Sequence, residues 1–116
     1  MNRNEARLKL GARLNTRARK SKQRIWRDAS EKVLASRKNR PEVNLNQISK
    51  FSKADSKILV PGKVLGLGEI DHKVTVGAVS FSRDARAKIL AAGGKCLEIP
   101  EFMESNSSTR DILLIG

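Results

Sequence analysis

Cationic side chains crowd one short stretch of this sequence, and the chemistry they offer is the binding of anions. Residues 13–27 read RLNTRARKSKQRIWR and hold seven Lys or Arg side chains in fifteen positions, five of them Arg. Arg presents a planar fork of donors that fits phosphate oxygens, and its guanidinium group stacks on bases. This stretch therefore indicates contact with a nucleic acid, whose counterions are released as each phosphate is neutralised.

The positive charge lies almost entirely in the first third of the 116-residue chain. Residues 1–40 carry fourteen Lys or Arg and three acids, a net charge of +11, whereas residues 41–116 carry ten and nine, a net charge of +1. The sequence predicts a basic helical RNA-binding extension over 1–40 and a compact α/β body over 41–116. A merely solubilising extension is the alternative, but mixed charges would solubilise equally well without self-repulsion.

Other chemistries lack the residues that they need. His72 and Cys96 are the only residues of their kinds, which leaves too few ligands for zinc and no partner for an internal disulfide. Asp71 and His72 with Ser80 or Ser82 would make a hydrolytic set, but nothing in the sequence brings them together, and an exposed turn explains the pair better. We expect no catalytic residue, metal, cofactor or small-molecule substrate.

The glycine-rich segment PGKVLGLG, residues 61–68, does not match a nucleotide-binding loop. A P-loop needs Ser or Thr directly after its Gly-Lys pair, and here Val64 follows Lys63. Two compatible interpretations remain: a tight turn between strands, or a backbone loop near RNA phosphate with Lys63 at its tip. No apolar run approaches the length that spans a bilayer, and no signal peptide is visible, although an Arg-rich transit peptide stays as an alternative.

Two helices are predicted in the basic extension, over residues 3–19 and 22–36, with Ser21 as the cap of the second. Apolar residues of the second helix recur at three- and four-residue spacing, so one side should face a core. Trp26 lies on that side, which favours burial over stacking on a base. Gly11 should weaken the first helix by roughly 1 kcal/mol relative to Ala.

Short strands and helices are predicted to alternate in the body, which favours an α/β fold with parallel pairing. A helix is expected over 83–92, capped by Ser82 and ended by Gly93-Gly94, and a short helix opens at Pro100. The expected strands are 43–48, 57–60 (ended by Pro61-Gly62), 73–81, 96–99 and 111–115, the last of them buried on both faces and preceded by a polar loop over 106–109.

Three segments carry a family resemblance. They are SRKNRPEVNLNQI (36–48), ILVPGKVLGLGEI (58–70) and KVTVGAVSFS (73–82). In order, spacing and wording they resemble the large-subunit ribosomal protein eighteen family of archaea and eukaryotes, which is related to bacterial large-subunit ribosomal protein fifteen. The resemblance implies an irregular α/β body of short strands and helices, preceded by a basic helical N-terminal extension.

The resemblance further implies a structural constituent of the large ribosomal subunit that binds its RNA, supports its assembly and contacts neighbouring ribosomal proteins in the cytoplasm. It places Arg40, Asn44 and Lys63 at the RNA. The full set of predicted RNA-binding residues is Arg7, Arg13, Arg17, Arg19, Lys20, Lys22, Arg24, Arg27, Arg37, Lys38, Arg40, Asn44 and Lys63. An architectural DNA-binding protein of the nucleoid is the alternative, and a small RNA-processing enzyme is a third, for which no catalytic motif is present.

Overall fold

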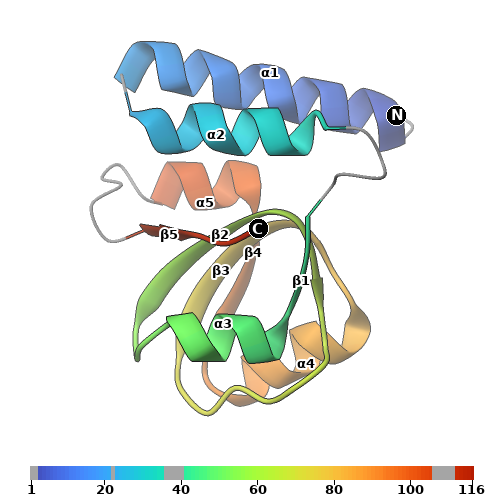
Figure 1. Ribbon diagram of the computed structural model, residues 1–116, viewed down its shortest axis with the longest axis vertical. Helices are drawn as coiled ribbons and strands as arrows, with labels where there is room; N and C mark the ends of the chain where they lie inside the picture. Colours follow the sequence, from blue (N-terminus) through green and yellow to red (C-terminus); the bar gives the residue numbers. More distant parts are fainter. Residues whose placement is uncertain (1–2, 22, 36–40, 106–111) are drawn as a thin grey trace. The chain divides into compact units, whose positions relative to one another are not determined.

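The computed structural model describes residues 3–21, 23–35, 41–105 and 112–116. The chain divides into two compact units, residues 1–40 and residues 41–116. We call the first the head and the second the body, and describe each by itself. Figure 1 labels the elements of both.

The head is a pair of packed helices, α1 (Arg3–Ser21) and α2 (Arg24–Val33). Both helices match the sequence prediction, so the basic helical character of this part of the chain is confirmed. The predicted cap is wrong, because the N-cap position of α2 is Gln23 and Ser21 is instead the last residue of α1. The first helix thus runs further than its apolar spacing indicated.

Close contacts between the two helices explain two residues of the head. Trp26 is fully buried and its Nε1–H donates to Gln23 Oε1 at 2.9 Å, so the prediction that it belongs to the core is confirmed. The Ser30 hydroxyl donates to the Gly11 carbonyl oxygen at 2.9 Å. A Cβ on Gly11 would collide with the Leu34 side chain. Gly11, which weakens an isolated helix, is therefore the point at which α1 allows the second segment to approach.

The body is built on a five-stranded sheet in which every pairing among the described residues is parallel. The strand order is β1-β2-β3-β4, and β5 pairs with β2 beside β1. The strands are β1 (Glu42–Asn44), β2 (Ser56–Leu65), β3 (Val74–Phe81), β4 (Lys95–Glu98) and β5 (Ile112–Leu114), and the helices are α3 (Leu45–Phe51), α4 (Arg83–Ala91) and α5 (Ile99–Ser105). The α/β class with parallel pairing is confirmed.

Strand β2 does not end at Pro61-Gly62, as predicted, but continues to Leu65. Its partner along one edge changes here, from β5 at Lys57–Leu59 to β1 at Lys63–Leu65, and its register with β3 shifts between Val60 and Lys63. Proline is tolerated within a strand at such an irregularity because no ladder hydrogen bond is needed from it. Gly62 passes against the Pro41 carbonyl, which a Cβ would strike.

A helix, α3, replaces most of the strand expected over residues 43–48. The alternation of apolar residues is real only as far as Asn44, where β1 ends. Asn44 is the N-cap of α3 and forms a capping box with Gln47, whose Oε1 accepts the Asn44 backbone N–H at 3.0 Å. Leu45 and Ile48 are then one helical turn apart and both are buried. The Asn-x-x-Gln spacing was a signal of helix initiation that the alternation masked.

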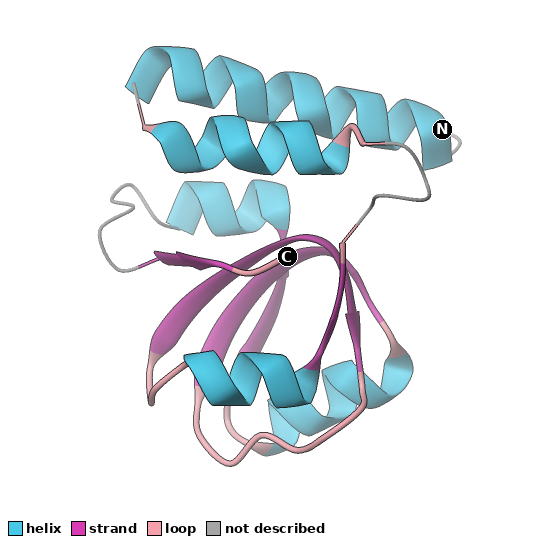
Figure 2. Ribbon diagram, viewed as in Figure 1, coloured by secondary structure: helices cyan, strands magenta, loops and turns pink. Residues whose placement is uncertain are grey.

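Two layers of helix cover the sheet (Figure 2). Helices α3 and α4 lie on the concave side, where Leu45, Ile48 and Ile89 join the main core with Val60 and Val76. Helix α5 lies on the other side, and its Phe102 packs on Gly77 so closely that a Cβ there would overlap the ring. The small residue in β3 thus makes room for the largest side chain of α5.

The remaining predictions for the body divide into confirmed and wrong. Strand 73–81 is β3, the helix after Ser82 is α4, and the Ser82 hydroxyl accepts the Ala85 N–H at 3.1 Å. Gly93 ends that helix with a φ of 85°. Burial of the last strand on both faces is wrong, because Leu113 of β5 is 39 % exposed. The predicted polar loop over 106–109 lies outside the described residues.

Candidate nucleic-acid interface

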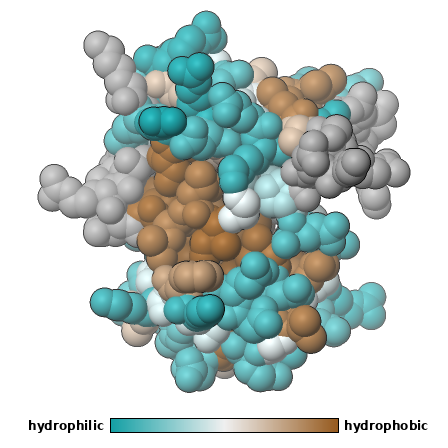
Figure 3. Space-filling model, viewed as in Figure 1, coloured by the Kyte–Doolittle hydropathy of each residue, from teal (hydrophilic) through white to brown (hydrophobic). Residues whose placement is uncertain are grey.

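The helical pair of the head turns most of the predicted RNA-binding cations toward solvent. Figure 3 shows a mainly hydrophilic surface over α1 and α2 in that view. The buried residues of α2 are Trp26, Ala29, Ser30 and Val33, so its cations fall on the other side of the helix. The predicted contacts that are exposed are Arg13, Arg19, Lys20, Arg24 and Arg27.

Two predicted contacts also serve the head itself. Arg7 Nη1 donates to the Ala35 carbonyl oxygen at 3.1 Å, which ties the first half of α1 to the end of α2. The guanidinium carbon of Arg17 lies 5.5 Å from the centre of the Trp26 ring, within the range of a cation–π contact. Both side chains are half-buried. They hold the two helices together, a role that the charge pattern alone did not reveal.

The ion pairs along α2 leave its cations accessible. Arg24 lies 3.8 Å from Asp28 and Arg27 lies 3.7 Å from Glu31, each pair one helical turn apart. The two arginine side chains are 90 % and 73 % exposed. Exposed pairs of this kind are worth about 0–1 kcal/mol, because water and salt screen them. A phosphate group can therefore replace either carboxylate at little cost.

Two predicted RNA contacts lie in the described part of the body. Lys63 is exposed but lies within β2, paired with Glu42 and Ser80, so its prediction at the tip of a loop is wrong. Asn44 is half-buried at the start of α3, where it forms the capping box. The other four predicted contacts lie outside the described residues; they are Lys22, Arg37, Lys38 and Arg40.

Lys88, which the sequence analysis did not single out, closes the glycine-rich loop after β2. Its Nζ donates to the carbonyl oxygens of Gly66 and Gly68 at 3.0 and 2.8 Å and lies 3.2 Å from a Glu69 oxygen. The loop thus directs two carbonyl oxygens at a cation of its own chain. This arrangement favours the interpretation as a structural connection between strands, and no local sequence signal predicts it because Lys88 lies about twenty residues further along.

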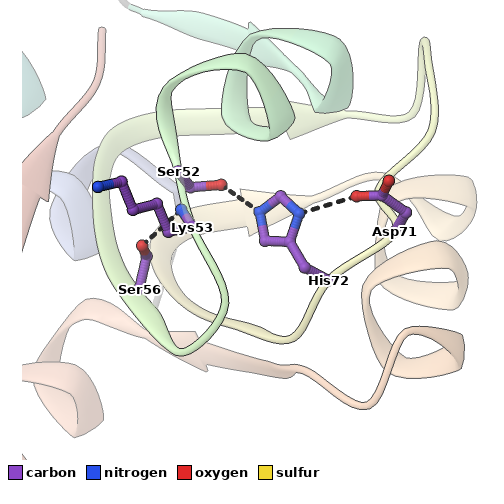
Figure 4. Close-up of polar contacts among 5 residues, drawn as sticks. All are labelled: Ser52, Lys53, Ser56, Asp71 and His72. Carbon is purple, nitrogen blue, oxygen red and sulfur yellow. Dashed lines mark hydrogen bonds and ion pairs between the residues drawn. The ribbon is translucent and has the colours of Figure 1, made fainter.

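A Ser-His-Asp hydrogen-bonded chain is present, but its serine is neither Ser80 nor Ser82. Ser52 Oγ and His72 Nε2 are 2.7 Å apart, and His72 Nδ1 and Asp71 Oδ1 are 2.9 Å apart (Figure 4). The hydrogen bond from His72 lowers the pKa of the Asp71 carboxyl below its ordinary value. The carboxylate can only accept, so Nδ1 donates to it and Nε2 of the neutral ring accepts the Ser52 hydroxyl proton.

The surroundings of this chain are those of a structural tie. In a catalytic triad the aspartate is buried and fixes the histidine. Here the Asp71 side chain is 91 % exposed and the His72 side chain is 18 % exposed, the reverse of that order. The prediction that both residues lie in an exposed turn is therefore wrong for His72, which joins the loop before β3 to the end of α3.

The described residues also bear on the cysteine, metal and membrane predictions. Cys96 is half-buried against the main core, and this burial raises the pKa of its thiol above the ordinary value, against a smaller lowering by Arg86. In the described ranges no group of three or more His, Cys, Asp or Glu side chains could hold a metal ion. None of the helices found there is long and apolar enough to cross a membrane.

Comparison with known proteins gives the class of the chain. Residues 22–97 match the family of ribosomal proteins that comprises 50S-L15, 50S-L18e and their 60S counterpart, so the chain belongs to this family. The resemblance found in the sequence is confirmed.

Individual relatives agree with this family assignment. The chain is 44 % identical over 91 residues to large ribosomal subunit protein eL18 of Methanothermobacter thermautotrophicus, covering 78 % of this chain and 75 % of the relative. It is 45 % identical over 87 residues to the eL18 protein of Sulfolobus acidocaldarius, covering 75 % and 74 %. The eL18 protein of Sulfurisphaera tokodaii is 36 % identical over 96 residues, covering 83 % and 81 %.

Proposed function

We propose that this protein is a structural constituent of the large ribosomal subunit in the cytoplasm, where it binds ribosomal RNA through phosphate groups and supports assembly. Family membership supports the place in the ribosome. The observation that carries RNA binding is the head, a packed helical pair with a net charge of +11 whose arginines and lysines mostly face solvent. Its partners are the large-subunit RNA and neighbouring ribosomal proteins.

The head suits the backbone of RNA better than its bases. Trp26, the aromatic side chain of the head, is buried and donates its N–H within the protein. Exposed Arg and Lys side chains remain, and they contact phosphates without reading sequence. Release of counterions makes such binding strongly dependent on salt, and six phosphate contacts lose about a thousandfold in affinity between low and moderate salt. Register on the RNA must then come from the shape of the protein.

Sedimentation of a cell lysate through a sucrose gradient, with a high-salt wash, tests this function. We expect the chain to remain with the large subunit after the wash, because an integral constituent is held by many contacts at once. Migration with chromosomal DNA would instead support an architectural DNA-binding role and overturn the proposal. Competition between purified large-subunit RNA and duplex DNA for the pure protein provides a second, independent readout of the same choice.

A further inference from the structure

The body, nearly neutral as a whole, concentrates lysines where its parallel strands begin. Parallel strands start at the same edge of a sheet, and the starts of β2, β3 and β4 come together at the lower left of Figure 1. Lys57 is the second residue of β2, Lys73 directly precedes β3, and Lys95 opens β4. Lys50 and Lys53 flank the end of α3 at this edge. All five side chains are exposed.

Sheet register places two of these lysines in one row. Lys57 pairs with Thr75, and Thr75 pairs with Lys95, so the three residues lie side by side across three strands and share one face. Strands are about 4.8 Å apart, which puts the two lysine Cα atoms roughly 10 Å apart with the threonine between them. The row presents two ammonium groups within reach of neighbouring phosphates on one strand of nucleic acid.

Hydrogen bonds hold the segments that carry the other lysines. The Lys53 N–H donates to Ser56 Oγ at 2.8 Å, and the Asp55 N–H donates to the Lys73 carbonyl oxygen at 2.6 Å. The link between Ser52 and His72 lies beside them (Figure 4). The turn before β2 and the loop before β3 are thus joined through main chain and side chain. A cationic surface whose backbone is already fixed loses less entropy when it binds.

Acidic residues are unevenly distributed along the strands. Asp55 and Asp71 are the acids at the starting edge in the described body, and Asp71 is engaged by His72. Glu42, Asp84 and Glu98 lie toward the other ends of the strands, at the partner of Lys63, in the first turn of α4 and at the end of β4. The strand starts therefore carry five lysines against two aspartates, a local excess that the net charge of the body conceals.

We propose that this lysine edge, defined as Lys50, Lys53, Lys57, Lys73 and Lys95, is a second binding surface for the phosphate backbone of ribosomal RNA. The inference rests on the proposed function, because the ligand is the RNA that the head binds. Lys provides point charges that suit phosphates irrespective of sequence, and a fixed surface on a second unit supplies the register that the head lacks. An acidic protein surface is the competing partner, which the experiment separates.

The experiment measures the affinity of the full chain for purified large-subunit ribosomal RNA across a range of salt concentrations. We expect K57Q/K95Q and K53Q/K73Q each to reduce the salt slope by about 2, because each lysine neutralises one phosphate. R83Q/R86Q is the matched control: it removes the same charge from α4, outside the lysine edge, and should leave the slope unchanged. Thermal unfolding should be the same for all variants, since the substituted side chains are exposed.

Three results would overturn the inference. Unchanged slopes for both lysine-edge variants, with a reduced slope for R19Q/K20Q in the head, would remove the second surface and leave the proposed function intact. An equal reduction by the R83Q/R86Q control would show a diffuse charge effect without a defined edge. Unchanged RNA affinity with lost binding to poly-glutamate would assign the edge to an acidic protein. Failure of the unmodified chain to bind RNA would instead contradict the proposed function itself.

Discussion

The head and the body present their cations in different ways. In the head the charge is a property of composition, since a net +11 within forty residues leaves most surface of any helical arrangement basic. In the body a net charge of +1 is spread over seventy-six residues, yet the fold gathers lysines at the starts of its parallel strands. The comparison teaches that net charge reports a binding surface only where one sign dominates the whole segment.

Removal of head charge should have the largest effect on RNA binding. R19Q/K20Q/R24Q/R27Q removes four exposed cations, and we expect large-subunit RNA affinity to fall on the order of a thousandfold at about 0.1 M salt. The salt slope should decrease by about 4. Filter binding over a salt series measures both. A slope like that of the unmodified chain would show that the head does not supply the phosphate contacts, and the comparison with the body would collapse.

Truncation of Phe102 should be the most damaging single change to the body. The ring is fully buried and packs on Gly77, so Phe102→Ala should lower the free energy of unfolding by about 3–5 kcal/mol. Urea unfolding followed by circular dichroism measures the loss. Leu113→Ala, an exposed position in β5, is the control and should change little. Equal losses for the two variants would contradict the packing described for α5.

Loss of the cap of α4 should have a smaller effect. Ser82→Ala removes the oxygen that accepts the Ala85 N–H, and we expect the free energy of unfolding to fall by about 1 kcal/mol. Ser82→Asp should restore stability, because aspartate caps equally well and is favourable at a helix N-terminus. If alanine and aspartate were equivalent, the measured loss would have a cause other than the hydrogen bond.

The smallest expected effect is a change in pH dependence at the Asp71–His72 tie. The pKa of Asp71 is lowered in the folded protein, so its stabilising contribution is present above the ordinary aspartate pKa and is lost as pH falls through the folded value. Asp71→Asn should therefore flatten the stability profile on the acid side and leave RNA binding by the head unchanged. Unfolding by urea at neutral and acidic pH measures the difference. Identical profiles for the two proteins would remove the tie from the account of the fold.

Local signals in the sequence predicted the elements whose causes are local. The apolar spacing of α2, the Ser82 cap and the run of β-branched residues in β3 each act within a few residues, and each prediction was confirmed. Strand β2 and helix α3 were mistaken because two local rules competed. Pro61-Gly62 usually ends a strand, and here a change of neighbouring strand accommodates it. Asn44 belongs to an alternating pattern and to a capping box, and the box determined the structure.

The candidate sites divide in the same way. Exposure of Arg19 and Lys20 in the head follows from the face of the helix that the apolar residues leave free. The roles of Arg7 and Arg17 within the helical pair depend on the second helix, and charge counting could not find them. The pairing of Ser52 with His72 joins residues that are twenty positions apart, so no spacing rule predicts it.

The sequence by itself determined the family, the α/β class and the concentration of charge in the first forty residues, because wording, periodicity and composition need no neighbours from elsewhere in the chain. Only the tertiary structure decided which lysines of the body stand together. Lys57 and Lys95 are thirty-eight residues apart, and they share a row because β2, β3 and β4 pair in parallel with one particular register. Register arises from the packing of buried side chains and backbone hydrogen bonds between strands, and these forces act only once the chain has folded.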